Sequence, residues 1–225
     1  MKRERPIVAI DGPVGAGKST IARRVAAEIG FSYLNTGAMY RAVALAAQAA
    51  GLTPDRDGIE PQLEPLLHSI TIEFAGDRLI LNGREVTGEL SRPEIGELAS
   101  RLSTLRIVRD RMRDLQRAAG GRGGVVMEGR DIGSAIFPDA EFKFFLDAEV
   151  QVRARRRYEE LRAKNVIINF DEVLEQLRQR DNRDSARALA PLIKAPDAMV
   201  VDSTDLTIDQ VVKQVVKLIK ARTEA

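Results

Sequence analysis

The stretch "GPVGAGKST", residues 12–20, directly follows the apolar run "PIVAI" and directly precedes "IARRVAAEIG". Its spacing, G-x-x-x-x-G-K-[ST], is that of a P-loop and is filled by Gly12, Gly17, Lys18 and Ser19, with a further glycine at Gly15. In such a loop the backbone N–H groups turn inward around an oligophosphate, the lysine reaches the outer phosphates, and the serine hydroxyl binds Mg²⁺. The stretch therefore predicts a nucleoside triphosphate site.

Both flanks of the motif agree with this interpretation. Residues 7–10 are apolar and indicate a short buried strand, and residues 17–29 have helical spacing, with Ile21 and Val25 on one side and Gly30 as the stop. A strand, a loop and a helix in this order are what the motif requires, and the helix N-terminus adds its dipole to the phosphate site. The alternative, a glycine-rich turn with an incidental lysine, leaves these flanks unexplained.

Composition narrows the classes of protein. The 225 residues are 44% hydrophobic and 30% charged, which is typical of a globular protein with one sizeable core. No cysteine is present, so disulfides and cysteine-bound zinc are excluded, and the single histidine, His68, argues against histidine-rich metal sites. Neither a signal peptide nor a run of roughly 18 apolar residues is evident, so we expect a cytoplasmic protein without a membrane partner.

The order of apolar and helical segments predicts the fold class. Four short apolar strands separated by helices predict an α/β fold, a parallel sheet covered by helices on both faces. The expected strands are residues 7–10, 124–128, 142–148 and 197–203, besides a short extended piece that ends at Leu34. The expected helices are residues 17–29, 37–51, a pair within 92–119, 149–165, 169–187 and a C-terminal helix opened by a capping box from Thr207 to Gln210.

Residues 70–87 break this rhythm. They alternate between apolar and polar side chains, with turn signals at residues 75–77 and 82–83, and the Asn-Gly pair at 82–83 is typical of a type I′ hairpin. We expect a small antiparallel β insertion there. Residues 52–68, which precede it, are polar and interrupted by prolines.

Arginines cluster in the segments that follow the strands. Ligands of such sheets lie beyond the carboxyl ends of the strands, and phosphoryl transfer between two anions needs cations there. The guanine signature N-K-x-D and the transporter signature L-S-G-G-Q are absent. The residues alone thus indicate a P-loop kinase of a small anionic acceptor, although each arginine taken singly is also typical of a solvated helix face. The arginines concerned are Arg41, Arg130, Arg153, Arg156, Arg157, Arg180, Arg183 and Arg187.

Four stretches together resemble bacterial cytidylate kinases, in the same order and over nearly the full length. They are "IDGPVGAGKST", "NTGAMYRAVALAA", "EGRDIGSAIFPDAEFKFFLDA" and "RDNRDSARALAPLIKAPDAMVVDST". The first is shared by many P-loop proteins, whereas the other three with the insertion are specific to this family among nucleoside monophosphate kinases. The resemblance implies a P-loop NTPase-type fold with a helical lid, and transfer of a phosphoryl group from ATP to CMP or dCMP with Mg²⁺.

The resemblance also implies roles for residues. ATP phosphates are expected at Gly12, Pro13, Val14, Gly15, Ala16, Gly17, Lys18, Ser19 and Thr20, with Ser19 on the metal, and at Arg153, Arg156 and Arg157 of the lid. CMP is expected at Thr36, Tyr40, Arg41, Ser100, Arg109, Arg130, Asp131, Arg180, Asp184 and Arg187. Within this set Thr36, Arg41, Arg130 and Arg187 hold the phosphate, Ser100, Arg109 and Asp131 read cytosine, and Arg180 and Asp184 meet the ribose. Lys18, Arg130, Arg156 and Arg157 are the expected catalytic residues.

The implied organisation is a single P-loop kinase domain over residues 1–225. Its core comprises residues 1–36, 121–150 and 171–225, its acceptor-binding region 37–120, and its lid 151–170. We expect a monomer that binds ATP and CMP or dCMP. Two positions depart from the family pattern: Thr36 replaces a serine and keeps the hydroxyl, and Glu128 replaces an aspartate, which leaves open whether it contacts Mg²⁺ or is structural.

Other functions compete with this interpretation. A uridylate, adenylate or shikimate-type kinase would have the same loop, and an ATP-switched, RNA-associated binding module is an alternative from a different class. Against the latter, the net charge is only +2, aromatic residues amount to 4%, and the arginines do not form one basic stripe. We therefore expect no stable nucleic-acid partner.

Overall fold

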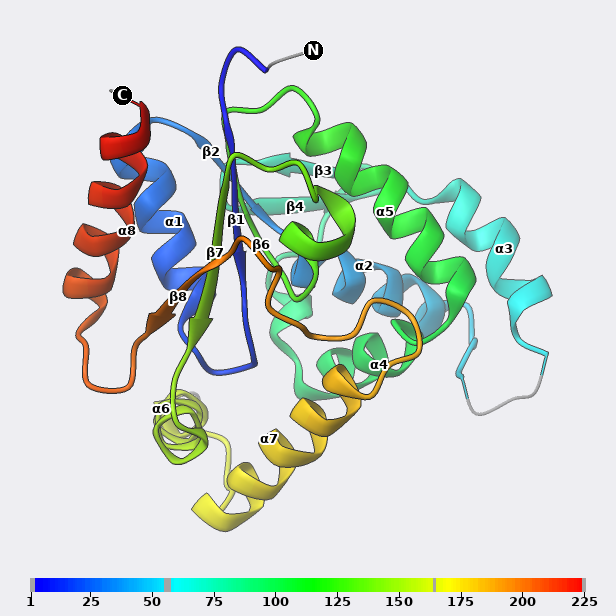
Figure 1. Ribbon diagram of the computed structural model, residues 1–225. Helices are drawn as coiled ribbons and strands as arrows, with labels where there is room; N and C mark the ends of the chain where they lie inside the picture. Colours follow the sequence, from blue (N-terminus) through cyan, green and yellow to red (C-terminus); the bar gives the residue numbers. More distant parts are fainter. Residues whose placement is uncertain (1–2, 55–57, 164, 224–225) are drawn as a thin grey trace. The chain divides into compact units, whose positions relative to one another are not determined.

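The computed structural model describes residues 3–54, 58–163 and 165–223. The chain forms two compact units (Figure 1). Unit 1 comprises Met1–Tyr33 and Gly123–Ala225, and unit 2 comprises Leu34–Arg122. Unit 1 is therefore built from two separate stretches of the chain, whereas unit 2 is continuous.

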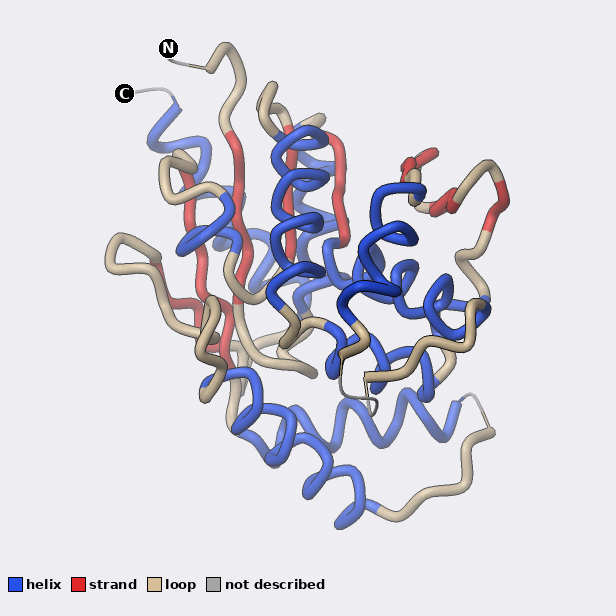
Figure 2. The backbone as a smooth tube through the Cα atoms, turned by 90° about the vertical axis from the view of Figure 1, so that its right-hand side faces the viewer, coloured by secondary structure: helices blue, strands red, loops and turns tan. Residues whose placement is uncertain are grey.

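Unit 1 is organised around a parallel sheet with the strand order β2-β6-β1-β7-β8 (Figures 1 and 2). The strands are β1 (Ile7–Asp11), β2 (Ser32–Asn35), β6 (Val125–Glu128), β7 (Phe142–Asp147) and β8 (Met199–Asp202). Every residue of β1 and β6 is buried, as expected for central strands covered on both faces. The predicted parallel sheet is confirmed, and the extended piece ending at Leu34 is its fifth strand.

Parallel register places the carboxyl ends of the central strands together. β1 pairs with β6 from Ile7 opposite Val125 to Ile10 opposite Glu128, and with β7 from Val8 opposite Phe142 onwards. The β7–β8 ladder is parallel as well and ends at the pair of Asp147 and Asp202. The polar segments that follow β1, β6 and β7 consequently begin at one edge of the sheet.

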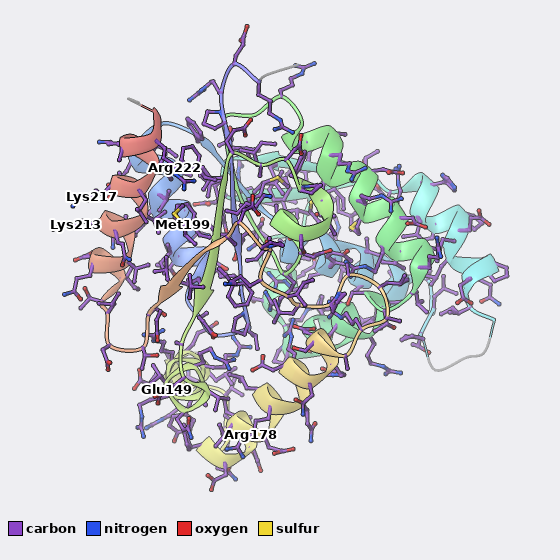
Figure 3. The ribbon with its side chains drawn as sticks, viewed as in Figure 1. Glu149, Arg178, Met199, Lys213, Lys217 and Arg222 are labelled. Atoms are coloured by element: carbon purple, nitrogen blue, oxygen red, sulfur yellow. The ribbon has the colours of Figure 1, made fainter. Side chains whose placement is uncertain are left out.

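Helices α1 (Lys18–Ile29) and α8 (Ile208–Thr223) pack against each other and against this sheet. The shared apolar cluster includes Ile10, Ile21, Val25, Val126, Phe144, Val201, Val212 and Val215. The capping box predicted for α8 is present, because the Gln210 amide donates to the Thr207 hydroxyl at 3.3 Å and the Thr207 amide donates to the Gln210 side chain at 2.8 Å. Lys213 and Lys217 lie on the outer side of α8 (Figure 3).

Three further helical segments belong to unit 1. The five-residue π-helical turn η2 (Ile132–Ile136) follows β6 and was not predicted. Helices α6 (Val150–Ala163) and α7 (Phe170–Ser185) pack on each other through Ala154, Leu161, Val173 and Leu177. A capping box formed by Asn169 and Glu172 begins α7.

Unit 2 contains α2 (Thr36–Ala49), α3 (Glu60–Ser69), η1 (Glu89–Ser91), α4 (Pro93–Leu102) and α5 (Arg106–Gly120), together with a small sheet. The sheet is antiparallel, with the order β3 (Ile72–Ala75), β4 (Arg78–Leu81) and β5 (Arg84–Glu85). At its second turn Asn82 and Gly83 have φ values of 50° and 78°. Two consecutive positive φ angles are what a type I′ turn requires, so the predicted insertion and its turn are confirmed.

Helix α3 lies in a segment for which no element was predicted. Pro61 falls in its first turn, where a missing N–H has no consequence, but Pro65 lies inside the helix. Leu63 and Leu67 are buried one turn apart, and the Arg111 side chain on α5 donates from Nε to the carbonyl of Leu67 at 3.0 Å. Packing on α5 thus maintains a helix that Pro65 disfavours. Among the described residues, no helix combines the length and apolar character that crossing a membrane requires.

Candidate active site

The loop after β1 has a backbone that only glycine permits at two points. Gly12 has a φ of 146°, and a Cβ atom on it would lie 2.0 Å from the carbonyl oxygen of Leu146 on the neighbouring strand. Gly15 has a φ of 80°, and its Cβ would lie 3.1 Å from Arg153. A side chain at either position would displace the backbone. The loop therefore passes tightly over the ends of β1 and β7 and leads into α1.

Lys18, the first residue of α1, is folded back onto this loop. Its ammonium donates a hydrogen bond to the carbonyl of Pro13 at 2.6 Å, and the side chain is buried. Burial lowers the pKa of Lys18 well below its usual value, and the nearby Arg130 and Arg180 lower it further, whereas Glu128 and Asp11 oppose the shift. Several cations thus converge near the loop, where an anionic ligand would stabilise them.

Glu128, at the end of β6, is held by a tyrosine. The Tyr33 hydroxyl donates to its carboxylate at 2.5 Å, and burial followed by the charge of Glu128 raises the pKa of Tyr33. The exposed Ser19 hydroxyl also interacts with the Tyr33 oxygen. Hydroxyl and carboxylate oxygens are the donors that Mg²⁺ takes from proteins, usually one or two with phosphate and water completing the shell. Ser19 and Glu128 fit that donor set.

Asp11, the last residue of β1, accepts two backbone hydrogen bonds from the start of η2. Ile132 N donates to Oδ1 at 2.9 Å and Gly133 N donates to Oδ2 at 2.7 Å. Burial raises the pKa of Asp11 to about 6; the two amides and Lys18 act in the opposite direction, and the charge of Asp131 adds to the increase. The carboxylate thereby ties the segment after β6 to the strand that precedes the P-loop.

Asp184, on α7, is the centre of an arginine cluster. Arg130 Nε lies 3.1 Å from its Oδ2, and Arg187 pairs with its Oδ1. Burial alone would raise the pKa of Asp184, but Arg130, Arg187 and Arg180 together lower it. The structure therefore brings together four residues predicted for CMP binding, and it uses Asp184 to hold two of the arginines.

The three predicted lid arginines have different surroundings. Arg153 is buried and donates to the carbonyls of Ala148 and Val14 at 2.8 and 3.0 Å, and it pairs with Asp181 on α7 at 2.7 Å. Arg156 donates to the carbonyl of Ser203 at 2.6 Å. Arg157 pairs with Glu160 along the same helix at 2.7 Å. Two of the three are thus attached to the backbone around the P-loop, and the third is not.

Among the remaining CMP candidates, Asp131 is buried in unit 1 directly before η2, and the others lie in unit 2. Thr36 is buried at the start of α2, where the Asn35 side chain accepts a hydrogen bond from Ala38 N at 2.8 Å as the N-cap, and Tyr40 and Arg41 follow on the same helix. Ser100 on α4 and Arg109 on α5 are both buried. Within the described part of the chain, the buried hydroxyl oxygen of Ser100 has no hydrogen-bond partner. Such an atom is suited to a ligand's polar group.

Comparisons with known proteins identify the family of the chain. The family model described as "Cytidylate kinase" matches residues 8–221. Cytidylate kinases of Fervidobacterium nodosum, Geobacter sulfurreducens and Solibacter usitatus are 43%, 45% and 45% identical to the chain, over 96%, 97% and 98% of it and 96%, 94% and 95% of their own lengths. The chain belongs to the cytidylate kinase family. The resemblance inferred from the motifs is confirmed, and with it the prediction that the chain is a kinase.

Solved structures support the fold of this cytidylate kinase family member. A protein of Thermus thermophilus aligns with a TM-score of 0.51 at 20% identity, covering 97% of both chains. A shikimate kinase from Bacteroides thetaiotaomicron aligns with a TM-score of 0.50 at 12% identity, covering 96% of this chain and 98% of its own. At these identities the likeness concerns the fold alone, a P-loop kinase fold.

Sequence reasoning missed three residues that take part in the hydrogen bonds around the P-loop. They are Asp11, Tyr33 and Ser203, whose hydroxyl donates to the carbonyl of Asp147 at 3.0 Å and accepts from Arg156 at 3.1 Å. A signal existed for Asp11, because a charged residue that ends the apolar strand "IVAID" has to be paired where it is buried. Tyr33 and Ser203 have no comparable signal in the sequence.

Proposed function

We propose that this cytidylate kinase family member transfers the γ-phosphoryl group of ATP to CMP or dCMP through the residues assembled around the P-loop and Asp184. A phosphate oxygen of CMP attacks the γ-phosphorus, the bond to the β–γ bridging oxygen breaks, and ADP leaves. The observation that carries this proposal is that the buried Asp184 holds the cations Arg130 and Arg187 beside each other, in the same unit as the P-loop lysine Lys18. Two anionic substrates meeting there would neutralise this charge.

On the donor side, residues 12–20 wrap the ATP phosphates. The backbone N–H groups of the loop and of the first turn of α1 point at the phosphates, and the helix dipole adds to their attraction. Lys18 leaves the carbonyl of Pro13, its partner at 2.6 Å, and follows the transferring phosphoryl group. A preorganised cation in this position stabilises the charge that spreads over the equatorial oxygens in the transition state.

A Mg²⁺ ion is the cofactor that this chemistry requires. Ser19 would bind it directly, and Glu128, which Tyr33 orients, would bind it directly or through a coordinated water molecule. When bound, the ion would supply positive charge that offsets the negative charge on the transferring phosphoryl group. The protein contributes the position of these two oxygen donors beside the P-loop.

On the acceptor side, we assign the CMP phosphate to Thr36, Arg41, Arg130 and Arg187. Asp184 aligns two of these arginines by pairing with both, so that their forks are preorganised for bidentate binding of phosphate. We assign the ribose to Arg180 and Asp184, and the base to Ser100, Arg109 and Asp131. The buried Ser100 hydroxyl, which lacks a hydrogen-bond partner among the described residues, supports a base-binding role.

Residues 151–170 form the proposed lid of a single kinase domain that acts as a cytoplasmic monomer on small-molecule nucleotides. Closure would offer phosphate oxygens as new acceptors to Arg153 and Arg156, which here donate to the carbonyls of Val14 and Ser203. A closed lid excludes water and so prevents hydrolysis of ATP. The attachment of Arg153 to both the P-loop and α7 supports a link between lid position and phosphate binding.

A comparison of CMP with UMP tests the base assignment. Cytosine presents an amino donor at C4 and an acceptor at N3, whereas uracil presents the opposite groups, so Asp131 as acceptor and Arg109 as donor mismatch uracil twice. Unpaired buried polar groups weaken the complex by about 1–3 kcal/mol each, so rejection of UMP by one or more decades in kcat/KM is expected. In Asp131→Asn the ratio of kcat/KM values should shrink, mainly through lost activity on CMP.

The experiment measures ADP release with CMP, dCMP, UMP and AMP for the wild type and for the variant. Asp139→Asn is the matched control, because Asp139 lies in an exposed loop and pairs with Arg3. An equal loss on CMP and UMP in Asp131→Asn would mean that Asp131 does not read the base. Preference of the wild type for another monophosphate would contradict the proposed substrate.

A further inference from the structure

The segment that joins β6 to η2 is hydrogen-bonded to β1 at two points, and two residues lie between these points. Before them, Gly129 N donates to the carbonyl oxygen of Ile10 at 3.1 Å. After them, Ile132 N and Gly133 N donate to the two carboxylate oxygens of Asp11 at 2.9 and 2.7 Å. The two residues between these anchors are Arg130 and Asp131. Their backbone position is therefore set by the end of β1, one residue before the P-loop begins.

The carboxylate of Asp11 accepts hydrogen bonds from two amides that no backbone carbonyl of the η2 turn accepts. The carbonyl of Asp131 accepts from Ala135 N and Ile136 N at 2.9 and 3.1 Å, so the turn satisfies its own later amides. The amides of Ile132 and Gly133 stand at its beginning, where helical segments leave N–H groups without internal acceptors. Asp11 accepts both of them, and all three residues are buried.

The surroundings make this attachment rigid. A Cβ atom on Gly133 would lie 3.4 Å from Asp11 Oδ2 and 3.1 Å from the stem of Lys143, so Gly133 is in close contact with both side chains. Lys143 is itself buried, donates to the carbonyl of Pro138 and pairs with Asp197 at 2.8 Å. The start and the end of the η2 segment are thus held by side chains from two adjacent strands, β1 and β7.

We propose that Asp11 is a positioning residue for the acceptor nucleotide, which fixes Arg130 and Asp131 relative to the P-loop by accepting the Ile132 and Gly133 amides. This inference rests on the proposed function, in which Arg130 holds the CMP phosphate and Asp131 reads the base. Asp11 itself touches neither substrate. Through one side chain it makes the geometry of the acceptor site depend on the strand that presents the donor site.

The chemistry of the attachment identifies the informative substitution. A carboxylate has acceptors on both oxygens, whereas the amide of Asn has one acceptor and one NH₂ donor. Asp11→Asn therefore keeps the size of the side chain but sets an N–H group against one of the two backbone amides. Because the substitution also removes a buried charge, the fold should persist while the loop shifts.

The kinetic test compares Asp11→Asn with wild type for both substrates. Displacement of the acceptor loop should raise KM for CMP by about tenfold or more and reduce the preference for CMP over UMP, with KM for ATP changed by less than about threefold. Asp202→Asn is the matched control, since Asp202 ends β8, is exposed and accepts a single amide, that of Thr204, at 2.8 Å. It should behave as wild type.

Three outcomes overturn the proposal: an unchanged KM for CMP, a change of the same size for ATP and CMP, or a change confined to ATP. The last would assign Asp11 to the P-loop. Failure of the proposed function is recognised separately, because the wild type would then not phosphorylate CMP at all.

Amide proton exchange tests the proposal without an activity assay, and it can be measured on the wild type even if the variant unfolds. In wild-type protein the amide protons of Ile132 and Gly133 should exchange slowly with solvent and resonate downfield, as expected for donors to a buried carboxylate. In Asp11→Asn one of the two should lose protection. Rapid exchange of either amide in the wild type would show that the attachment does not exist in solution.

Discussion

Asp11 and Asp184 are two buried carboxylates of unit 1 with opposite electrostatic surroundings. Asp11 faces backbone amides, one lysine and another acid, and its pKa is raised to about 6. Asp184 faces Arg130, Arg187 and Arg180, and its pKa is lowered in spite of burial. Amides are thus enough to hold a loop on the carboxylate of Asp11, whereas the arginines around Asp184 are held together by an ionised carboxylate.

We expect the largest effect on activity from removing the ammonium of Lys18, the lysine near Asp11. Lys18→Ala should lower kcat by two or more orders of magnitude, because one preorganised electrostatic contact in the transition state contributes roughly 3–4 kcal/mol. The exposed Lys217 on α8 supplies the control, and Lys217→Ala should keep the wild-type rate (Figure 3). Stopped-flow or coupled ADP-release assays measure both. A folded Lys18→Ala enzyme with more than about a tenth of the wild-type kcat would remove Lys18 from catalysis.

On the other side of the comparison, Asp184→Asn should reduce the free energy of unfolding by about 3 kcal/mol. The substitution leaves Arg130 and Arg187 without their shared buried counter-charge, and breaking a buried ion pair on one side is strongly destabilising. Urea denaturation of the unliganded protein at pH 7 measures the change, with the exposed Asp171 on the same helix replaced by Asn as control. A loss as small as that of the control would show that the arginines repel each other too weakly to need Asp184.

The pH dependence of stability should separate the two carboxylates by sign. The raised pKa of Asp11 means that the folded protein binds this proton more tightly than the unfolded chain, so its contribution is present below pH 4 and is lost as pH rises through about 6. Relative to that of the wild type, the free energy of unfolding of Asp11→Asn should therefore increase by on the order of 2–3 kcal/mol between pH 4 and pH 6.5. Urea denaturation at half-unit intervals measures this difference.

Asp184 should behave in the opposite way. Its pKa is lowered from 3.8, so its stabilising contribution is present above that value and is lost as pH falls through the folded pKa. The difference in the free energy of unfolding between wild type and Asp184→Asn should thus be constant from pH 5 to pH 7 and shrink in acid. A constant difference for Asp11→Asn from pH 4 to pH 6.5 would contradict the raised pKa of Asp11.

The strand and the helix around the P-loop could be predicted from the sequence because their signals are local. The P-loop spacing, the strand before it and the helix after it all lie within residues 7–29, and the structure has them in that order. The antiparallel insertion was equally readable, since Asn82 and Gly83 specify their own turn. Helix α3 was not, because the burial of Leu63 and Leu67 against α5 depends on a contact with a distant segment.

Contacts between distant segments also limit what the sequence predicts about the residues proposed to bind CMP. Motifs identified Arg130, Asp184 and Arg187 as candidates, but not that the Asp184 carboxylate pairs with Arg130, 54 residues away in the sequence, as well as with Arg187 on the next turn. Arg153, Arg156 and Arg157 are nearly adjacent in sequence, yet the structure gives them carbonyl partners on two different loops and a glutamate on their own helix. The attachment of Ile132 and Gly133 to Asp11 has no spacing pattern, because it joins the ends of two strands that only the sheet brings together.

The ladders of β1 have a consequence for the synthesis of the chain. β1 pairs with β6 and β7, and all of unit 2 is translated between β1 and these two partners. At about 5–20 residues per second, β6 leaves the ribosome on the order of ten seconds after β1. During that interval the apolar residues 7–10 have neither neighbour, and the continuous segment of unit 2 is completed only at its end. A nascent chain that stops within unit 2 therefore carries the sequence of a nucleotide site without the sheet on which that site is built.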